Sequence, residues 1–583
     1  MKPHFSHAVQ GILFLLFSTT LCAQTYITNV TVIDVERHKI IPNKTVVLVN
    51  EIITEIGNGS LKVPPGATQI DGKGKFLMPG LVDAHVHFFQ NGGLYTRPDA
   101  INLQEAKPYE NEIARAKELM ESQLKRYLRN GITTVIDPGS TFSFLKLKEQ
   151  FKDDEFAPNI YMSGPLFTTY EPEVYRNRND DEPFHLVKTV DDAKKMLQQQ
   201  LTRKPDFVKI WYIAKVDGLD PEAGARKYLP VVKAIIDEAH KHNIKVAVHA
   251  TERITAQLSV ENGADYLVHG IEDELLTDDF VKLIKAKNVI LCPTLVVASG
   301  YDLTFAQNRN TNIHELREGD PFQLGSLLDL KHLKLRDSTL IGDYKKHANS
   351  PKSLEKCRRE TEICEKNLKK LSDAGVIIAT GTDAGNIGTL HASSYLDEVL
   401  AMKKAGMSNW KIIEASTING AKVLGKQQEF GSITKGKTAD LILLDANPVD
   451  NIENLTKINR VFHHGIVHEP SKILPETPEE LVQRQLNAYN FRNIEGFLET
   501  YSDDVELYDY PDKLIGKGKD GMRKTYAKMF AEIPDLHCEI LGRIVQGNTI
   551  IDKERVNFGT QTVEAVAMYI VENGKIKKVY FIQ

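Results

Sequence analysis

The stretch MPGLVDAHVHFF, residues 78–89, decides how the rest of the chain is interpreted. An apolar run ends there in His85 and His87, which stand two residues apart. If the run is a β-strand, its period of two places both imidazoles on one face. Two imidazoles on one face at the end of a strand form a candidate metal-binding pair.

Four more candidate ligands stand at the ends of similar short apolar runs. They are Lys209 in DFVKIWY, His249 in IKVAVHATE, His269 in ADYLVHGIE and Asp383 in VIIATGTDAGN. Each run is rich in β-branched residues and is followed by Gly or polar residues, as is typical of a strand that ends in a loop. A barrel of parallel strands collects the strand C-termini in one mouth, so ligands distant in sequence become neighbours. We therefore predict that all six residues share one site.

The region around these residues alternates predicted strands with predicted helices. Segments such as YENEIARAKELMESQLKRYLRNG and YLPVVKAIIDEAHKHN carry apolar residues three and four positions apart and end in Gly or Asn, which favours helices. Eight strands separated by crossover helices predict an α/β fold of the (β/α)₈ TIM-barrel type. The eight strands are expected near Val82, Thr134, Tyr161, Val208, Val246, Tyr266, Ile290 and Ile378.

Strand patterns also occur on both sides of the predicted barrel. Residues 24–78 alternate β-branched residues with turns, and residues 429–470 contain the matching runs LILLDANP and INRVFHHGIVH. We predict one composite β-sandwich built from both segments, with the barrel, residues 79–428, inserted between them. Within the barrel, the charged sequence at about 300–370 has a helical pattern and predicts a cap that helps to shape the substrate pocket.

The last part of the chain, residues 476–583, follows a segment rich in Pro and Glu. Its amphipathic helical pair, LVQRQLNAYNFRNIEGFLETY, precedes a series of strands that includes the turn signal Glu-Asn-Gly-Lys. Helices first and strands afterwards predict a separate α+β domain.

Composition and the N-terminal sequence indicate the class of protein and its cellular location. The chain is 42% hydrophobic and 26% charged with a formal net charge of −5, which fits a globular protein and gives no reason to expect nucleic acid or a membrane as partner. Lys2 and His4 precede the apolar run GILFLLF, so residues 1–23 are predicted to be a signal peptide cleaved near Ala23. The mature protein is expected to be secreted or periplasmic; lipidation at Cys22 is the alternative.

The other cysteines do not predict a disulfide framework. Cys357 and Cys364 are seven residues apart in a helical stretch, which separates their Cα atoms by about 10 Å, too far for a disulfide. Cys292 and Cys538 have no partner in a Cys-x-x-Cys pattern. We expect buried free thiols and no zinc–thiolate site.

The six ligands imply a two-metal centre. Imidazole and carboxylate suit Zn²⁺, with Mn²⁺ or Fe²⁺ as alternatives. A free ammonium on Lys209 would be repelled by two cations, whereas its carbamate, formed with CO₂, is an anion that can bridge them. Two bridged metals lower the pKa of a shared water and polarise a carbonyl group. Asp383 can then act as general base and pass the proton to the leaving amine.

These motifs resemble the amidohydrolase superfamily, in its secreted, prolidase-like and imidazolonepropionase-like branch. The resemblance rests on PGLVDAHVH, the lysine of DFVKIW, VAVHA, LVHG, GTDAGN and GSITKGKTADLILLDANP, and it covers about residues 26–468. It implies that His85, His87 and Asp383 bind a first metal, that His249 and His269 bind a second, and that carbamylated Lys209 bridges the two.

A second resemblance concerns the C-terminal domain. FLETYSDDVELYDYP is similar to the SnoaL-like cone of ketosteroid isomerase-type domains, in which an Asp base and a Tyr donor can share an apolar cup. Asp503, Asp504, Tyr508 and Tyr510 are present but do not define an acid–base pair. A role in dimerisation or in gathering substrate is the favoured alternative to catalysis.

Substrate contacts are predicted from the loops that follow the strands. An arginine there can pair with a substrate carboxylate in bidentate fashion. The candidates are Tyr95, Arg97, Arg176, Arg178, Tyr212 and His391.

We predict a metal-dependent amidohydrolase that cleaves a C–N bond of a small substrate, such as a dipeptide or an N-acyl amino acid, by a metal-activated hydroxide. Lactonase, cyclic imidase or deaminase chemistry on the same centre is the first alternative. An isomerase or binding role of the C-terminal cone is the second. Self-association of the chain is left open by the sequence.

Overall fold

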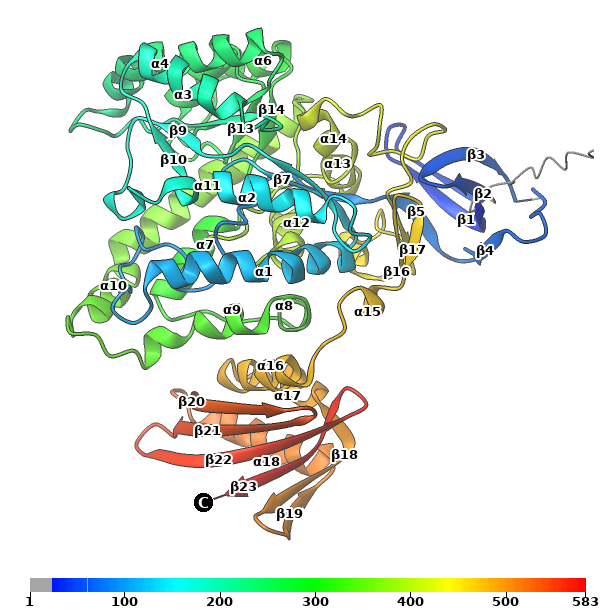
Figure 1. Ribbon diagram of the computed structural model, residues 1–583, viewed down its shortest axis with the longest axis vertical. Helices are drawn as coiled ribbons and strands as arrows, with labels where there is room; N and C mark the ends of the chain where they lie inside the picture. The colour runs from blue at the N-terminus through cyan, green and yellow to red at the C-terminus, as the bar shows by residue number, and fades with distance from the viewer. Residues whose placement is uncertain (1–23, 60, 583) are drawn as a thin grey trace, which may run out of the picture.

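The computed structural model of the protein describes residues 24–59 and 61–582. A large α/β body lies beside a small sheet formed near the N-terminus, and a curved sheet lies on another side of the body (Figure 1). The predicted signal peptide, with Cys22 and the cleavage position at Ala23, lies outside the described residues.

Parallel strands form the centre of the α/β body. One sheet has the order β6-β7-β8 and the other the order β10-β9-β11-β12-β13-β14, and every pair within them is parallel. Parallel strands with helices between them define the α/β class. The bounds are β6 (Leu81–Asp83), β7 (Ile132–Asp137), β8 (Asn159–Met162), β9 (Leu166–Thr168), β10 (Phe184–Leu186), β11 (Val208–Trp211), β12 (Val246–His249), β13 (Tyr266–Val268) and β14 (Ile290–Cys292).

The eighth predicted strand is reduced to a single bridge. Ile378 pairs with Leu291 of β14, and the described residues form no ladder there beyond this single bridge. The chain beyond this bridge runs beside the segment that follows β6, where the backbone N–H of Asp383 donates to the carbonyl oxygen of His85 at 2.7 Å. Backbone hydrogen bonds therefore carry Asp383 to the first strand although almost 300 residues separate them.

The third predicted strand, near Tyr161, differs from the expectation. It ends at Met162, and the chain turns at Gly164, whose φ of +79° lies in the region that favours glycine. It then forms β9, which pairs with β11, and β10 pairs with the outer edge of β9. The sequence did not predict these two short strands, because three-residue runs carry no readable period.

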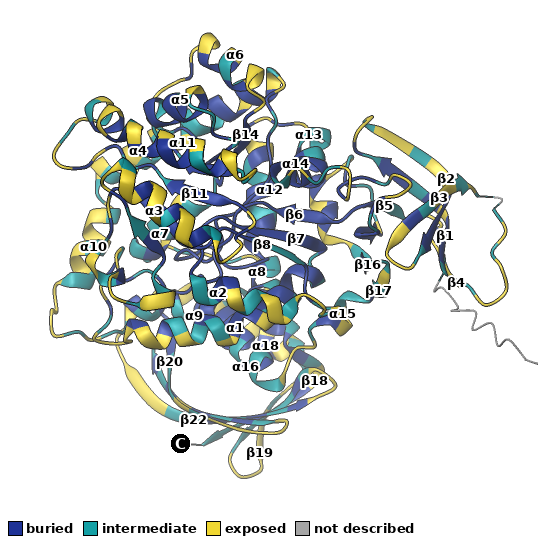
Figure 2. Ribbon diagram, turned by 45° about the horizontal axis from the view of Figure 1, so that its top comes forward, coloured by how far each residue is buried: buried dark blue, intermediate teal, exposed yellow. Residues whose placement is uncertain are grey.

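Helices cover the outside of the parallel strands, and their exposed faces contrast with the buried strands (Figure 2). The two segments predicted as helices are confirmed as α1 (Tyr109–Arg129) and α4 (Pro221–Lys241). The other helices of this body are α2 (Phe142–Leu147), α3 (Val190–Leu201), α5 (Arg253–Glu261), α6 (Asp278–Ala286), α12 (Ser394–Lys404), α13 (Asn409–Ala415) and α14 (Ile418–Leu424).

A run of helices fills the long interval between β14 and the bridge at Ile378. They are α7 (Val297–Phe305), α8 (Ile313–Glu318), α9 (Pro321–Ser326), α10 (Leu340–Ala348) and α11 (Pro351–Asp373). Asn312, Asp320 and Ser350 cap α8, α9 and α11 with side-chain oxygens, which explains why these helices start just after those residues.

Strands from both ends of the predicted barrel join one hydrogen-bonded sheet. Its order is β17-β16-β15-β5-β1-β2-β3, and β4 pairs with β1. Apolar side chains of both segments, including Ile27, Val46, Leu441 and Phe462, pack in one cluster. The bounds are β1 (Gln24–Asp34), β2 (Lys39–Val49), β3 (Ile52–Asn58), β4 (Thr68–Asp71), β5 (Phe76–Pro79), β15 (Leu441–Leu444), β16 (Ile458–His463) and β17 (Ile466–His468), with α15 (Pro470–Ile473) after them.

The C-terminal part is a six-stranded sheet with three helices. The sheet has the order β19-β18-β23-β22-β21-β20. The expected order of helices before strands is only partly right, because α18 (Lys519–Glu532) lies between β19 and β20. The other bounds are α16 (Pro478–Asn490), α17 (Ile494–Glu499), β18 (Tyr501–Asp509), β19 (Lys513–Lys517), β20 (His537–Gln546), β21 (Thr549–Asn557), β22 (Thr562–Glu572) and β23 (Lys575–Ile582).

This C-terminal part packs on the inserted helices. Leu316 of α8 and Leu324 of α9 belong to the same apolar cluster as Leu481 and Val482 of α16. Asn487 of α16 also donates its side-chain N–H to the carbonyl oxygen of Pro321 at 2.6 Å. Figure 1 shows α16 directly below α8 and α9.

Two smaller expectations are tested by the described residues. All four cysteines among them are free, with Cys292 and Cys538 buried and Cys357 and Cys364 partly exposed on α11. Among the same residues, no helix combines the length and the apolar character needed to cross a bilayer.

Candidate metal centre

Three polar atoms lie close together, on the segment that follows β6 and on the segment that follows the bridge at Ile378. Oδ1 of Asp383 lies 3.2 Å from Nε2 of His85 and 3.0 Å from Nε2 of His87, and the two nitrogens lie 3.2 Å from each other. In a triangle with sides of about 3.1 Å, a point can lie about 2.0–2.1 Å from all three corners, which is the bond length of Zn²⁺ to nitrogen and oxygen ligands. The residues present therefore fit a divalent metal ion.

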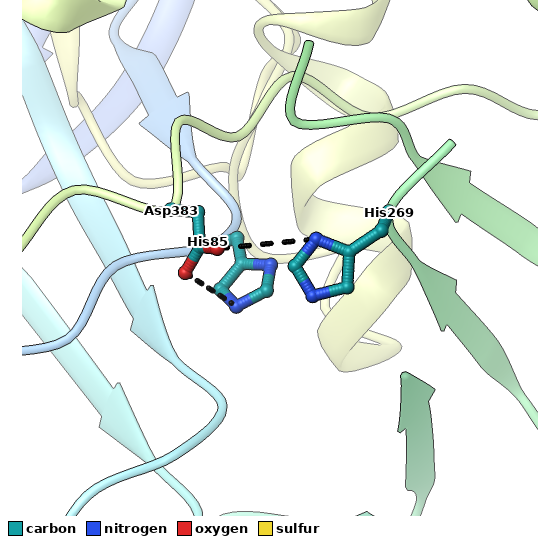
Figure 3. Close-up of side chains that lie close together, drawn as sticks. All are labelled: His85, His269 and Asp383. Carbon is teal, nitrogen blue, oxygen red and sulfur yellow. Dashed lines mark ion pairs between the residues drawn. The ribbon is translucent and has the colours of Figure 1, made fainter. Parts of the chain in front are cut away.

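A third imidazole faces the same carboxylate. Nδ1 of His269 lies 3.9 Å from Oδ2 of Asp383, and its ring centroid lies 5.0 Å from that of His85 (Figure 3). The ring of His249 follows at 4.4 Å from that of His269. Atoms of His85, His269 and Asp383 are close enough to share one ion.

Lys209 completes the predicted set. Together with His87, His249, His269 and Asp383 it lines a cavity of about 760 Å³. The side chain is only 1% exposed. The structure thus brings five of the six predicted ligands to the cavity surface, while His85 lies fully buried behind them.

Strand register places these side chains. Lys209 of β11 lies beside Ala247 of β12, and His249 at the end of β12 lies beside Trp211 and Val268. His269 is the first residue after β13, so the three predicted ligands leave neighbouring parallel strands at one edge.

The backbone is strained at the site. His269, Thr294 and Asp383 have φ values of +80°, +46° and +58°. Positive φ is uncommon for residues with a side chain and costs free energy, so the surrounding structure must hold these residues in place.

Hydrogen bonds fix the orientation of two imidazoles. Nδ1 of His87 lies 2.7 Å from the carbonyl oxygen of Gly139. Because a carbonyl oxygen only accepts, Nδ1 carries a hydrogen, and Nε2 is the nitrogen left to bind a metal ion beside Asp383. Nδ1 of His269 lies 2.7 Å from Oγ1 of Thr294, a contact that holds the direction of that ring.

Burial dominates the electrostatics. It lowers the pKa values of His85, His249 and His269 well below the usual range, and the positive charge of Lys209 adds to this effect. Burial also lowers the pKa of Lys209 to about 7. Neutral imidazoles and a neutral amine are the forms that bind metals or react with CO₂.

His87 is the exception among the imidazoles. Burial opposes its charged form, but the carboxylates of Asp137 and Asp383 outweigh burial and raise its pKa to about 9 in the absence of a metal. A cation at the triangle would replace the proton that these carboxylates favour.

Two supporting carboxylates were not predicted from the sequence. Asp83 accepts hydrogen bonds from the backbone N–H and the hydroxyl of Thr382 at 3.0 and 2.8 Å, and burial raises the pKa of Asp83 to about 7. Asp137 lies 3.4 Å from Nδ1 of His87 and accepts from the backbone N–H of Phe88. The signal was present, since both are acidic residues at the ends of apolar runs, and Asp83 is two residues before His85.

The six predicted substrate contacts lie in different places. Only Arg97 lines the cavity, and its guanidinium donates to Asp99 and to Asn386. The hydroxyl groups of Tyr95 and Tyr212 donate to Asp329 and to the carbonyl oxygen of Ala225, away from the cavity lining.

The other three candidates also have partners of their own. Arg176 and Arg178 form ion pairs with Glu171 and Glu110. His391 is buried, stacks on Phe88 at 5.3 Å between ring centroids, and contacts the carbonyl oxygen of His87 through Nε2 at 3.2 Å.

Five other histidines do not line the cavity. His240 and His242, at the end of α4 and just after it, are exposed. His463 and His464 form a second cluster with Asp440, in which Nδ1 of His463 lies 3.1 Å from the carboxylate. His468 is buried in β17 of the same sheet, so the last three lie away from the cavity.

With this geometry in place, comparison with known proteins assigns the family. The pattern of the "Amidohydrolase family" matches residues 76–467, more than half of the chain, and the "SnoaL-like domain" matches residues 482–579. The chain therefore belongs to the amidohydrolase family and is an enzyme of that class.

Individual relatives are distant. An ochratoxinase from Aspergillus niger is 23% identical over 447 residues, covering 72% of this chain and 81% of the relative. An imidazolonepropionase from Alkaliphilus metalliredigens is 24% identical over 446 residues, covering 75% and 90%. Among solved structures, a Xaa-Pro dipeptidase with methionine bound in its active site has a TM-score of 0.58 at 22% identity and covers 77% of this chain and 100% of that one. The structural likeness establishes an amidohydrolase-type fold.

Proposed function

We propose that the protein is a metal-dependent hydrolase that cleaves a C–N bond of a small substrate, such as a dipeptide or an N-acyl amino acid. The observation that carries the proposal is the triangle of His85, His87 and Asp383, whose sides of 3.0–3.2 Å suit a divalent ion. Two buried atoms of the site, Nδ1 of His85 and Oδ1 of Asp383, have no hydrogen-bond partner in the described chain.

The proposed ligand assignment follows the family pattern. His85, His87 and Asp383 would hold a first ion, His249 and His269 a second, and carbamylated Lys209 would bridge them. Zn²⁺ is the favoured metal, with Mn²⁺ or Fe²⁺ as alternatives. Such ions, when bound, lower the pKa of water and polarise a carbonyl group. The burial of Lys209 near the imidazoles of His85, His249 and His269 supports the bridge, because a permanent ammonium would be costly there.

The chain's own residues supply the proton transfer. Asp383 lines the cavity and can accept a proton from the attacking water through its carboxylate. The same carboxyl group can then donate the proton to the leaving nitrogen. His87 and His269 keep their rings in place through Gly139 and Thr294, so the receiving geometry is fixed before substrate binds.

The names of the relatives favour amide cleavage but leave alternatives. The likeness to a Xaa-Pro dipeptidase supports a peptide-like substrate. The names imidazolonepropionase and 5-methylthioadenosine/S-adenosylhomocysteine deaminase instead indicate a cyclic substrate and a deamination. Lactonase, cyclic imidase or deaminase activity on the same centre is therefore the alternative.

We also propose a domain division. The two groups of parallel strands would be parts of one (β/α)₈ barrel, residues 79–428, with a cap at about 300–370. Residues 24–78 and 429–470 would form the β-sandwich, and residues 476–583 the SnoaL-like cone. Export through a signal peptide at residues 1–23 remains part of this proposal.

A hydrolysis screen tests the function. The mature chain from Gln24 would be loaded with Zn²⁺ or Mn²⁺ in bicarbonate and offered dipeptides, N-acyl amino acids, cyclic imides and lactones. We expect Asp383→Asn to lower kcat/KM by about 10³-fold, the range of a general base. The matched control is Asp237→Asn, on the exposed side of α4. Silence across all four classes, or full activity of Asp383→Asn, would refute the proposal.

For the C-terminal part we propose self-association rather than catalysis. One face of its sheet packs on the helices, while the other carries an apolar row across all six strands, with Tyr508 and Tyr580 stacked at 4.9 Å. From β19 to β20, cross-strand partners in this row are Leu514, Tyr508, Tyr580, Met568, Ile551 and Ile544.

A second copy of the chain is a suitable partner for this row. Flanking charges are already paired within the sheet, as in Glu506 with Lys517 and Arg555 with Glu564, so face-to-face contact buries no isolated charge. Six strands about 4.8 Å apart and about 30 Å long offer roughly 850 Å², close to the ~800 Å² that each partner contributes to a stable interface.

Sedimentation velocity tests the association. We expect the full chain to sediment as a dimer and Ile544→Asp to sediment as a monomer. Ile544 is 64% exposed, and Leu275→Asp, at a residue 57% exposed outside this sheet, is the matched control. A monomeric parent protein would exclude the proposal.

A further inference from the structure

One wall of the cavity beside the metal centre is aromatic. We define the aromatic wall as Leu166 of β9, Phe184 of β10 and Trp211 of β11, all of which line the cavity. Trp211 stacks on Phe184 with 5.1 Å between ring centroids and 24° between planes. The ring of the proposed ligand His249 meets Trp211 edge-on at 6.1 Å. The aromatic wall therefore begins at the metal centre itself.

The aromatic wall is held rigidly from behind. Phe184 is 7% exposed and packs against the buried Tyr175 at 5.4 Å between centroids. Leu166 and Phe184 are direct partners in the β9–β10 ladder, which fixes their separation. Trp211 is partly exposed, so its free surface faces the cavity. Such a surface is a preformed site for a planar apolar group.

Apart from Lys209, the cations around the cavity already have partners. Arg97 pairs with Asp99 at 2.7 Å, Arg358 with Glu355 at 2.6 Å and Lys404 with Glu365 at 2.7 Å. Because these three positive charges are neutralised, they offer no free cation as a second anchor for a substrate carboxylate, and the aromatic wall contributes apolar contact.

Resting on the proposed function, we propose that the aromatic wall binds an aromatic side chain next to the scissile C–N bond. The substrate class is then N-acylated aromatic amino acids and dipeptides that contain an aromatic residue. Trp211 is the residue that determines this preference. Burying an aromatic ring against such a wall predicts at least tenfold tighter binding than that of the glycine analogue.

The tryptophan content offers a binding assay independent of turnover. The chain has only two tryptophans, and Trp410 lies elsewhere, stacked on His38. In the variant Trp410→Phe, Trp211 is the sole tryptophan. Combined with Asp383→Asn to prevent turnover and loaded with Zn²⁺, it would be titrated with N-acetyl-L-phenylalanine and with N-acetylglycine. We expect a saturable change in Trp211 emission and a Kd at least tenfold lower for the aromatic probe.

Kinetics provide the second readout. We expect Trp211→Ala to reduce the phenylalanine-to-glycine ratio of kcat/KM at least tenfold, mainly through KM for the aromatic substrate, and Trp211→Leu to reduce it less. Trp410→Ala is the matched control and should keep the parent ratio. Equal Kd values for the two probes, or no response of Trp211 to millimolar N-acetyl-L-phenylalanine, would overturn the inference. Selective binding without hydrolysis of either probe would support the aromatic wall and contradict the proposed reaction.

Discussion

Buried ionisable groups occur both in the candidate metal centre and inside the C-terminal sheet, and their hydrogen bonding differs between the two regions. In the sheet, Asp552 accepts two hydrogen bonds from Arg543, each at 2.7 Å, and the hydroxyl of Tyr569 donates to Glu554 at 2.9 Å. In the candidate metal centre, Oδ1 of Asp383, a residue that lines the cavity, is left without a hydrogen-bond partner in the described chain. Burial of charge alone therefore does not identify a functional site; unmet ligand atoms at a cavity do.

The largest expected difference comes from breaking the pair in the sheet. Asp552→Ala leaves Arg543 largely buried without its carboxylate and should lower the free energy of unfolding by about 3–5 kcal/mol. Urea denaturation measures this loss, and kcat/KM of the folded fraction should not change. The control is Asp503→Ala, whose side chain is 97% exposed. A loss of activity without a loss of stability would show that the two regions are not as distinct as described.

The pH dependence of stability gives the next contrast. Burial raises the pKa of Glu554 from 4.5 to about 7, so between these values the folded state binds more protons than the unfolded state. Its contribution is complete below about pH 4.5 and is lost as the pH rises through 7, by about 3 kcal/mol in total. Denaturation of the parent and of Glu554→Gln from pH 4.5 to 8 isolates the term. Identical slopes in the two proteins would contradict it.

A smaller effect is expected for metal affinity in the candidate metal centre. A Cβ atom at Gly139 would lie 2.7 Å from Cε1 of His87, so Gly139→Ala should displace that ring and weaken metal binding about 10–100-fold. Competition with a chelator measures the affinity. Gly521→Ala serves as control, because a Cβ there meets nothing within 4 Å. Unchanged affinity would mean that His87 is not held through Gly139.

The six proposed ligands could be found from the sequence because a parallel strand leaves two signs, an apolar run and a polar residue at its end. The same period of two also distinguishes Trp211 from Tyr212. Trp211 stands two residues after Lys209 and shares its face, whereas the neighbouring Tyr212 points away and donates to Ala225. Alternation alone would have favoured Trp211 over Tyr212 as a cavity residue.

Other features had no local signal. The pairing of Phe184 with Leu166 depends on a turn at Gly164 and on two three-residue strands, which are too short for a period to be read. The approach of Asp383 to His85 depends on backbone hydrogen bonds between segments far apart in the chain. Long-range pairing of this kind is decided by the whole fold, not by any window of sequence.

The inserted helices contact two different regions, the cavity and the C-terminal part. Residues of α7 and α11 line the cavity, while Leu316, Leu324 and Leu327, in and just after α8 and α9, are buried in the cluster shared with α16. A chain that kept the α/β body but lost its last hundred residues would expose these leucines to water. Evolution can therefore discard or exchange the C-terminal part only together with changes in the insertion, so the two should be inherited as one unit across related sequences.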